Sequence, residues 1–150
     1  MVVADSFNKR FGPSTNEMPR CLLPLVNVPL IEYTLECLAS NNVMQIFIVC
    51  CAHAEKIKQY IAASKWAKGP IEVEVIISEH HRSVGDVLRE MDEKQLLVAD
   101  FILVQGDLVS NAKLTKALEE HKTRREKDKN AIMTLVLKQA SPSHPTRFSS

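Results

Sequence analysis

The residues whose types could do chemistry lie in two loops that follow predicted strands. The first loop, 5–18, begins DSFNKRF and follows a short apolar start, and its only glycine, Gly12, comes late. The second loop, 105–107, reads Gln-Gly-Asp and follows the apolar run 101–104. Loops of this kind bring backbone N–H groups to phosphate oxygens in nucleotide-binding α/β domains. An aspartate at such a strand end could also hold a magnesium ion, so both loops are candidate ligand sites.

The elements that must position these loops alternate along the chain. Several of the apolar runs are hydrophobic on both faces, which is typical of a mostly parallel sheet covered by helices on both sides. In such sheets ligands bind beyond the carboxyl ends of the strands, which here means the loops after Ala4, Cys51, Ser78 and Val104. We therefore predict an α/β, Rossmann-like fold. Strands are expected at 1–4, 45–51, 71–77, 101–104 and 131–137, and helical stripes begin at Pro29, Ile57, Val84 and Leu114, the second closing at Gly69-Pro70.

Composition excludes several classes of protein. The 150 residues are 45% hydrophobic and 25% charged, with a formal net charge of +1. This balance is typical of one globular domain, and it leaves no global field to attract DNA or an anionic membrane. No apolar run is long enough to cross a bilayer, and the start lacks a secretory signal. The four cysteines form no C-x-x-C pair and are expected to be buried free thiols, which suits a reducing cytosol.

The opening of the chain resembles the sugar-nucleotide pyrophosphorylases. Their pattern is A-G-G-x-G-T-R-L-x-P followed by P-K-P-L-x-P-x-x-N-x-P-L-I, and the segment 103–107, LVQGD, resembles their strand ending in Gly-Asp. That resemblance implies a nucleotidyltransferase fold in which Asp107 would hold magnesium. The residues in register are Arg10, Pro13, Pro19, Arg20 (in place of the Lys), Leu22, Pro24, Asn27, Pro29, Leu30 and Ile31.

Departures from this pattern argue against nucleotidyl transfer. Asp5, Ser6 and Asn8 stand where the catalytic family has three glycines, so side chains obstruct close backbone approach to a polyphosphate. Asp5 also places an anion against phosphate, a repulsion of about 4 kcal/mol at ~4 Å and an effective dielectric near 20. We predict that Asp5, Ser6, Asn8, Arg10, Arg20, Gly106 and Asp107 form a vestigial pocket, with no catalytic residue, no cofactor and no metal. Asp107 would be a metal ligand only if the chain were an active pyrophosphorylase.

Other polar clusters have ordinary interpretations. A Gly-Asp at a strand end is more often a turn whose carboxylate caps backbone N–H groups. The adjacent His80 and His81 diverge on a loop and are expected to be surface residues. The acidic residues around 79–92 are expected to be solvated. The basic run 122–129 mixes charges without aromatic residues, which indicates a solvated helix end, with subunit contact as the alternative.

A non-catalytic branch of this family matches more of the chain. The runs VVADSFNKRF, PRCLLPLVNVPLIEYTLE, RSVGDVLREMD and SPSHPTR resemble the epsilon-subunit family of the guanine-nucleotide exchange factor for eukaryotic translation initiation factor two. The resemblance implies that residues 1–150 are part of a nucleotidyltransferase-like first domain, its last ten or so residues a loop or frayed end. The β-helix and the C-terminal exchange domain would be absent.

The resemblance also implies a function. The parent subunit would promote GDP/GTP exchange in translation initiation, and this segment would be a non-enzymatic scaffold in the cytosol. Its partners would be the gamma and other subunits of the exchange factor and initiation factor two, with no DNA and no membrane. The alternative is an active magnesium-dependent sugar-nucleotide pyrophosphorylase, and a third possibility is a module that binds nucleotides without turnover.

Overall fold

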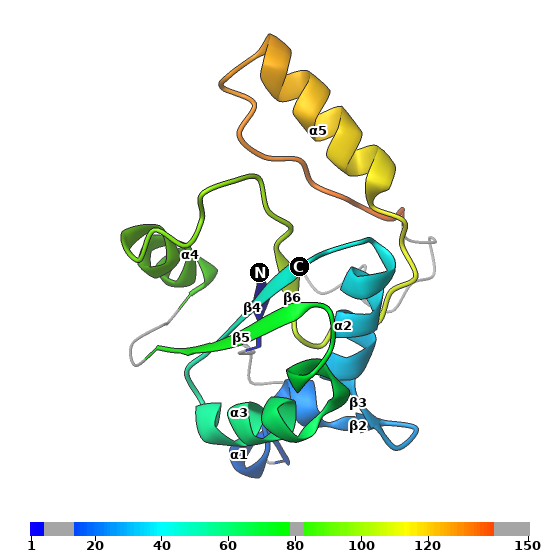
Figure 1. Ribbon diagram of the computed structural model, residues 1–150, viewed down its shortest axis with the longest axis vertical. Helices are drawn as coiled ribbons and strands as arrows, with labels where there is room; N and C mark the ends of the chain where they lie inside the picture. Colours follow the sequence, from blue (N-terminus) through cyan, green and yellow to red (C-terminus); the bar gives the residue numbers. More distant parts are fainter. Residues whose placement is uncertain (5–13, 79–82, 140–150) are drawn as a thin grey trace. The chain divides into compact units, whose positions relative to one another are not determined.

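A parallel sheet forms the centre of the described structure. The computed structural model describes residues 1–4, 14–78 and 83–139 (Figure 1). Four strands are hydrogen-bonded in the order β5-β4-β1-β6, and every pair in this sheet is parallel. The α/β prediction with a mostly parallel sheet is therefore confirmed. The strands are β1 (Val2–Val3), β4 (Gln45–Cys50), β5 (Glu72–Ile77) and β6 (Val104–Gln105).

Helices cover both faces of this sheet, as the sequence predicts. Successive side chains of a strand point to opposite faces, so Val2 joins one hydrophobic cluster and Val3 the other. The larger cluster packs beneath α2 (Leu30–Ser40) and α3 (Ala54–Ala63), and the smaller one beneath α4 (Val84–Glu93). Figure 1 shows α4 separated from α2 and α3 by the strands. Because side chains alternate along each strand, α2 and α3 cover one face of the sheet and α4 covers the other.

A tight hairpin precedes α2. Its strands β2 (Pro24–Leu25) and β3 (Val28–Pro29) are antiparallel, and the two residues between them both have positive φ, 51° at Val26 and 68° at Asn27. Two-residue hairpin loops of type I′ require this geometry at both positions. Asparagine tolerates it, whereas for other L residues the left-handed region costs about 1–2 kcal/mol. The hairpin therefore holds strain at Val26. Pro29 ends β3 instead of opening the helix, which begins at Leu30.

Two short elements lie between β1 and this hairpin in the sequence. They are α1 (Ser14–Glu17) and η1 (Arg20–Leu22).

A polar cluster joins α2 to α3 and to the segment after it. The carboxylate of Glu32 accepts hydrogen bonds from the Tyr60 hydroxyl at 2.9 Å and from the Nε1–H of buried Trp66 at 2.8 Å. Trp66 belongs to η2 (Lys65–Ala67). Burial of the Tyr60 hydroxyl and its hydrogen bond to Glu32 raise the pKa of Tyr60 to about 12.

Serine caps determine two helix boundaries. α3 ends at Ala63, before the predicted Gly69-Pro70, because Ser64 caps η2 by accepting from the Trp66 backbone N–H. α4 begins after Ser83, whose Oγ accepts from the Asp86 backbone N–H at 3.2 Å. Two of the acidic residues expected to be solvated here, Asp86 and Glu90, are partly exposed and have partners. Asp86 pairs with Arg89, and Glu90 accepts a hydrogen bond from the buried Ser78 hydroxyl.

The chain divides into two compact units, Met1–Ala112 and Lys113–Ser150. The second unit contains α5 (Thr115–Lys127), in which no residue is buried. The strand predicted at 131–137 is wrong: these residues have no regular structure. A strand requires a neighbour for its backbone N–H and C=O groups, and the apolar pattern alone supplies none. The exposed side chains of this segment are Ile132, Met133, Leu135, Val136 and Leu137.

The strand predicted at 101–104 is also shorter than expected. Only Val104–Gln105 pairs with β1, while residues 101–103 have no regular structure. None of the helices within the described ranges is long and apolar enough to span a bilayer. The expected frayed end, 141–150, lies outside the described residues.

Candidate functional site

The candidate site lies at the carboxyl edge of the sheet. Because all four strands are parallel, their carboxyl ends lie at one edge. The loop after β6 is described and contains Gly106 and Asp107. The loop after β1 lies outside the described residues, and with it Asp5, Ser6, Asn8 and Arg10. Of the seven predicted pocket residues, the structure therefore places Arg20, Gly106 and Asp107, and it brings those three together.

Arg20 and Asp107 form a direct ion pair. The Arg20 Nε lies 2.7 Å from the Asp107 Oδ2, and the two side chains are 22% and 17% exposed. A separation this short is a charge-assisted hydrogen bond, and partial burial protects it from screening by solvent. The predicted turn is present, since the Leu108 N–H donates to the Gln105 carbonyl. The Asp107 carboxylate was expected to cap backbone N–H groups of this turn. It faces instead the guanidinium of Arg20, on η1.

Tight packing at Gly106 brings the two charges together. The Gly106 N–H donates to the Val3 carbonyl at 2.8 Å. A Cβ at position 106 would lie 3.0 Å from the Cα of Ala4 and 3.3 Å from the Cβ of Cys21. Cys21 is buried and neighbours Arg20 on η1. Glycine is therefore required here by close approach, and that approach sets η1 against the loop that contains Asp107.

A buried hydroxyl, which sequence reasoning missed, anchors the same loop. Thr34 of α2 is fully buried, and its Oγ1 donates to the Leu108 carbonyl at 2.9 Å, with the Gln105 carbonyl 3.5 Å away. The signal that could have found it is its position in the apolar stripe of α2, between Ile31 and Leu35. A threonine among buried aliphatic residues must find an acceptor. Here it fixes the turn that positions Asp107.

The described residues do not fit a magnesium site. Mg²⁺ is usually bound by carboxylate oxygens together with phosphate or water oxygens. The Asp107 carboxylate is instead neutralised by Arg20. Among residues 1–4, 14–78 and 83–139, no group of three or more His, Cys, Asp or Glu side chains could hold a metal ion. A cation at Asp107 would have to compete with a guanidinium at close range.

The remaining candidates do not form a second reactive centre in the described structure. None of the four cysteines forms a disulfide, as predicted, and three of them are buried, while Cys51 is half-buried. His80 and His81 lie outside the described residues. Residues 122–129 are exposed, in agreement with a solvated helix end. A hollow along α5 is lined by Lys116, Glu119, Glu120, Thr123, Arg124 and Lys127.

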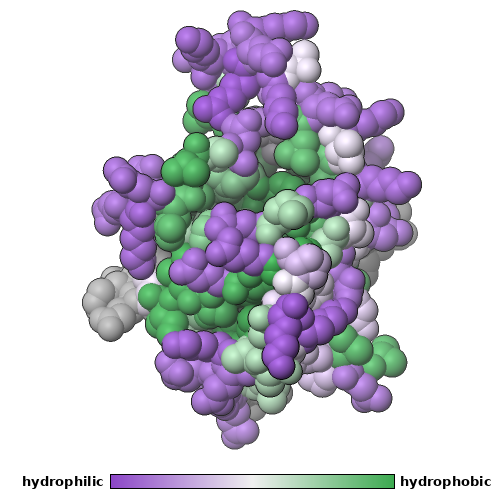
Figure 2. Space-filling model, in the orientation of Figure 1, coloured by the Kyte–Doolittle hydropathy of each residue, from purple (hydrophilic) through white to green (hydrophobic). Residues whose placement is uncertain are grey.

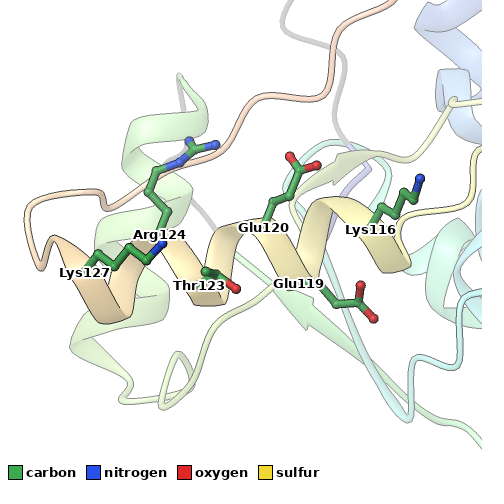
Figure 3. Close-up of a pocket in the computed structure, with 6 residues that line it drawn as sticks. All are labelled: Lys116, Glu119, Glu120, Thr123, Arg124 and Lys127. Atoms are coloured by element: carbon green, nitrogen blue, oxygen red, sulfur yellow. The ribbon is translucent and has the colours of Figure 1, made fainter.

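That hollow has little capacity for specific binding. All six lining side chains come from one helix and spread along it, with acidic and basic groups intermixed (Figure 3). Figure 2 shows α5 covered by hydrophilic side chains. A helix that is polar on all sides is typical of a solvated surface.

Comparison with known proteins agrees with this architecture. The nucleotidyl transferase family model matches residues 4–145. The chain is 56% identical to translation initiation factor eIF2B subunit epsilon of Schizosaccharomyces pombe and 53% identical to that of Dictyostelium discoideum, each over 98% of the chain. It is 28% identical to the gamma subunit of Dictyostelium discoideum over 91% of the chain. It spans 22%, 21% and 31% of these three relatives.

A solved structure supports the same fold. A protein from Bacillus anthracis described as a glucose-1-phosphate thymidylyltransferase superposes with a TM-score of 0.69 at 15% identity, over 83% of this chain and 50% of that one. The identities to the two epsilon subunits confirm that resemblance along nearly the whole sequence. With a family match from residue 4 to residue 145, the chain belongs to the nucleotidyl transferase family.

Proposed function

We propose that this chain acts within the epsilon subunit of a guanine-nucleotide exchange factor for translation initiation factor two. The observation that carries the proposal is 56% and 53% identity to eIF2B epsilon subunits over 98% of the chain. The chain spans about a fifth of those relatives, so the exchange activity is assigned to the parent subunit. The share proposed for this segment is assembly: docking onto the gamma and other subunits and helping to present initiation factor two, in the cytosol.

We further propose that this segment has lost nucleotidyl transfer. Two observations support the loss. Asp5, Ser6 and Asn8 replace the glycines of the catalytic pattern. Arg20, at the basic position of that pattern, is engaged by Asp107, at its metal-binding position. A nucleoside triphosphate with magnesium would have to compete with this ion pair for the Arg20 Nε and the Asp107 Oδ2, and the energy of weakening the pair opposes binding.

Two assays test the proposal. Co-purification of the tagged chain from cytosol is expected to recover the other exchange-factor subunits. Incubation with a sugar 1-phosphate, a nucleoside triphosphate and magnesium is expected to release no pyrophosphate, with an active pyrophosphorylase as the positive control. Pyrophosphate release would favour the catalytic alternative. Recovery of no other subunit would refute the assembly role.

Two further measurements separate the remaining functions. Residues 1–150 alone are expected not to accelerate GDP release from initiation factor two, and measured acceleration would place exchange activity in this segment. Calorimetric titration with GTP, ATP and a nucleotide sugar distinguishes a pure scaffold from a nucleotide sensor. We expect no heat of binding from the first two ligands, because the Arg20–Asp107 pair occupies the charges that would face a triphosphate.

A further inference from the structure

Strand β5 forms one edge of the parallel sheet, next to β4 (Figure 1). It runs for six residues, whereas β6 at the other edge has only two. Proteins usually protect edge strands with proline, lysine or a bulge, because unpaired backbone groups can pair with another chain. The segment 71–77, IEVEVII, contains neither proline nor lysine, and its register with β4 is continuous. β5 is therefore a regular edge strand.

The backbone groups that point away from the sheet belong to alternate residues of β5. The N–H groups of Glu72 and Ser78 donate to carbonyls at the two ends of β4, at 3.0 and 2.9 Å. Because successive residues of a strand alternate in direction, the N–H and C=O groups of Val73, Val75 and Ile77 point outward. Among the residues that the structure describes, none forms a backbone hydrogen bond with these outward groups.

These three residues are spaced so that the edge can pair with a copy of itself. In an antiparallel pair, residues at a hydrogen-bonded position exchange two backbone hydrogen bonds. If a two-fold axis passes through Val75, that residue faces its own copy, and Val73 faces Ile77 of the second copy. Each outward N–H and C=O group of the three residues then has a partner. A contact of this kind closes at two copies, because each copy has one β5 edge.

The aliphatic side chains of β5 fit the same register. Val73 and Val75 are partly buried against the larger hydrophobic cluster, and Ile77, on the same face by alternation, is 38% exposed. The pairing places Val75 against its own copy and Val73 against Ile77. Cross-strand pairs of apolar side chains are the contacts that stabilise a sheet. Self-pairing would thus cover apolar surface as well as backbone groups.

The two glutamates of β5 favour this register over its neighbour. Glu72 and Glu74 are exposed on the opposite face of the strand. With the axis at Val75, Glu74 lies opposite Ile76 of the second copy, so no carboxylate faces another. With the axis at Glu74, the two Glu74 carboxylates would face each other, and like charges directly opposite destabilise an antiparallel pair. The charge pattern is therefore compatible with self-pairing centred on Val75.

We propose that β5 pairs antiparallel with β5 of a second copy of this chain, about a two-fold axis at Val75. The inference goes beyond the proposed function and does not depend on it. Only one strand from each copy takes part, so we expect a weak, concentration-dependent dimer. The remainder of the subunit is a competing occupant, since this chain covers 50% of the solved structure that superposes on it. Another subunit of the exchange factor is the second competitor.

Two cysteine variants, Val75→Cys and Glu74→Cys, test this register. Hydrogen-bonded antiparallel residues have Cα atoms about 5.5 Å apart, which suits a disulfide between two copies of Val75→Cys. Two copies of Glu74→Cys would lie diagonally at about 7–8 Å, too far apart for a disulfide. Random collision would instead favour Glu74→Cys, because Glu74 is the more exposed of the two residues. The two variants therefore separate specific pairing from chance contact.

The measurement is the rate of disulfide-linked dimer formation in oxidised glutathione, followed by non-reducing gel electrophoresis. It is made on this chain and on the full-length subunit. The unsubstituted chain, with its four free cysteines, gives the background rate. We expect Val75→Cys to form the dimer at least ~10-fold faster than Glu74→Cys, because its sulfur atoms start within disulfide distance.

Each other outcome contradicts the proposal. A rate for Val75→Cys equal to or below that of Glu74→Cys would overturn the pairing itself. A dimer that forms with this chain and is lost in the full-length subunit would identify the remainder of the subunit as the occupant of the edge. A dimer of the full-length subunit that disappears when the gamma and other subunits are co-expressed would identify one of those subunits instead. The assembly role is tested separately, by co-purification.

Discussion

Substitution of Gly106 by alanine tests the packing on which the candidate site is built. The added Cβ would lie 3.0 Å from the Cα of Ala4 and 3.4 Å from the carbonyl oxygen of Val3. Both atoms belong to backbone at the centre of the sheet, so a change of rotamer relieves neither contact. Forced overpacking costs about 1–3 kcal/mol, while a Gly→Ala change returns about 0.4–1 kcal/mol through the unfolded chain. We expect a net loss of about 1–2 kcal/mol in the free energy of unfolding.

Gly85→Ala is the matched control for this measurement. Its Cβ would meet the Ser83 Oγ at 3.6 Å and the Arg89 guanidinium at 3.7 Å, which are ordinary contacts, and Gly85 lies inside α4. Alanine there should raise the free energy of unfolding by about 0.5–1 kcal/mol. Urea denaturation followed by circular dichroism measures both variants. If Gly106→Ala matched or exceeded the unsubstituted chain in stability, the close approach of β1, η1 and the β6 turn would be refuted.

Two further predictions concern polar contacts between elements. In a Tyr33→Phe background, ultraviolet titration of Tyr60 should give a pKa of about 12, and Glu32→Gln should lower that pKa toward its ordinary value without reaching it, because burial persists. Because the pKa of Tyr60 is higher in the folded chain than in the unfolded chain, its contribution to stability is complete below about pH 10 and is lost as pH rises from 10 to 12. An ordinary pKa for Tyr60 would contradict the Glu32 contact. Ser83→Ala should destabilise the chain by about 1 kcal/mol in urea denaturation, because the Asp86 N–H loses its cap, and an unchanged midpoint would contradict that cap.

The layer structure could be predicted because each of its signals is local. Alternation along β1 separates Val2 from Val3, and the apolar run of β4 is buried on both faces, so period and composition suffice to assign a covered parallel sheet. The segment 131–137 shows that local sequence signals alone do not predict a strand correctly. Its β-forming composition is clear, yet a strand exists only through a neighbouring strand, and sequence alone does not supply that neighbour.

The candidate site could be predicted in its residues but not in its contacts. The motifs identify Arg20 and Asp107 separately as pocket residues. They predict a turn or a metal ion as the partner of Asp107, and they do not predict that the two side chains contact each other. Their pairing depends on long-range geometry: Gly106 packs against β1 and against Cys21 of η1, and the Thr34 hydroxyl holds the turn. Thr34 in particular gives only a weak signal, because a threonine in an apolar stripe specifies that it needs an acceptor but not which one.

The Arg20–Asp107 pair also bears on the proposed loss of nucleotidyl transfer. A half-buried guanidinium and a half-buried carboxylate each need a counter-charge. In a pocket that accepts a triphosphate and a cation, the ligand can supply both. In this chain the two side chains satisfy each other instead. Restoring glycines to the loop would then leave an energetic barrier in place, because a ligand would still have to compete with an ion pair whose atoms lie 2.7 Å apart.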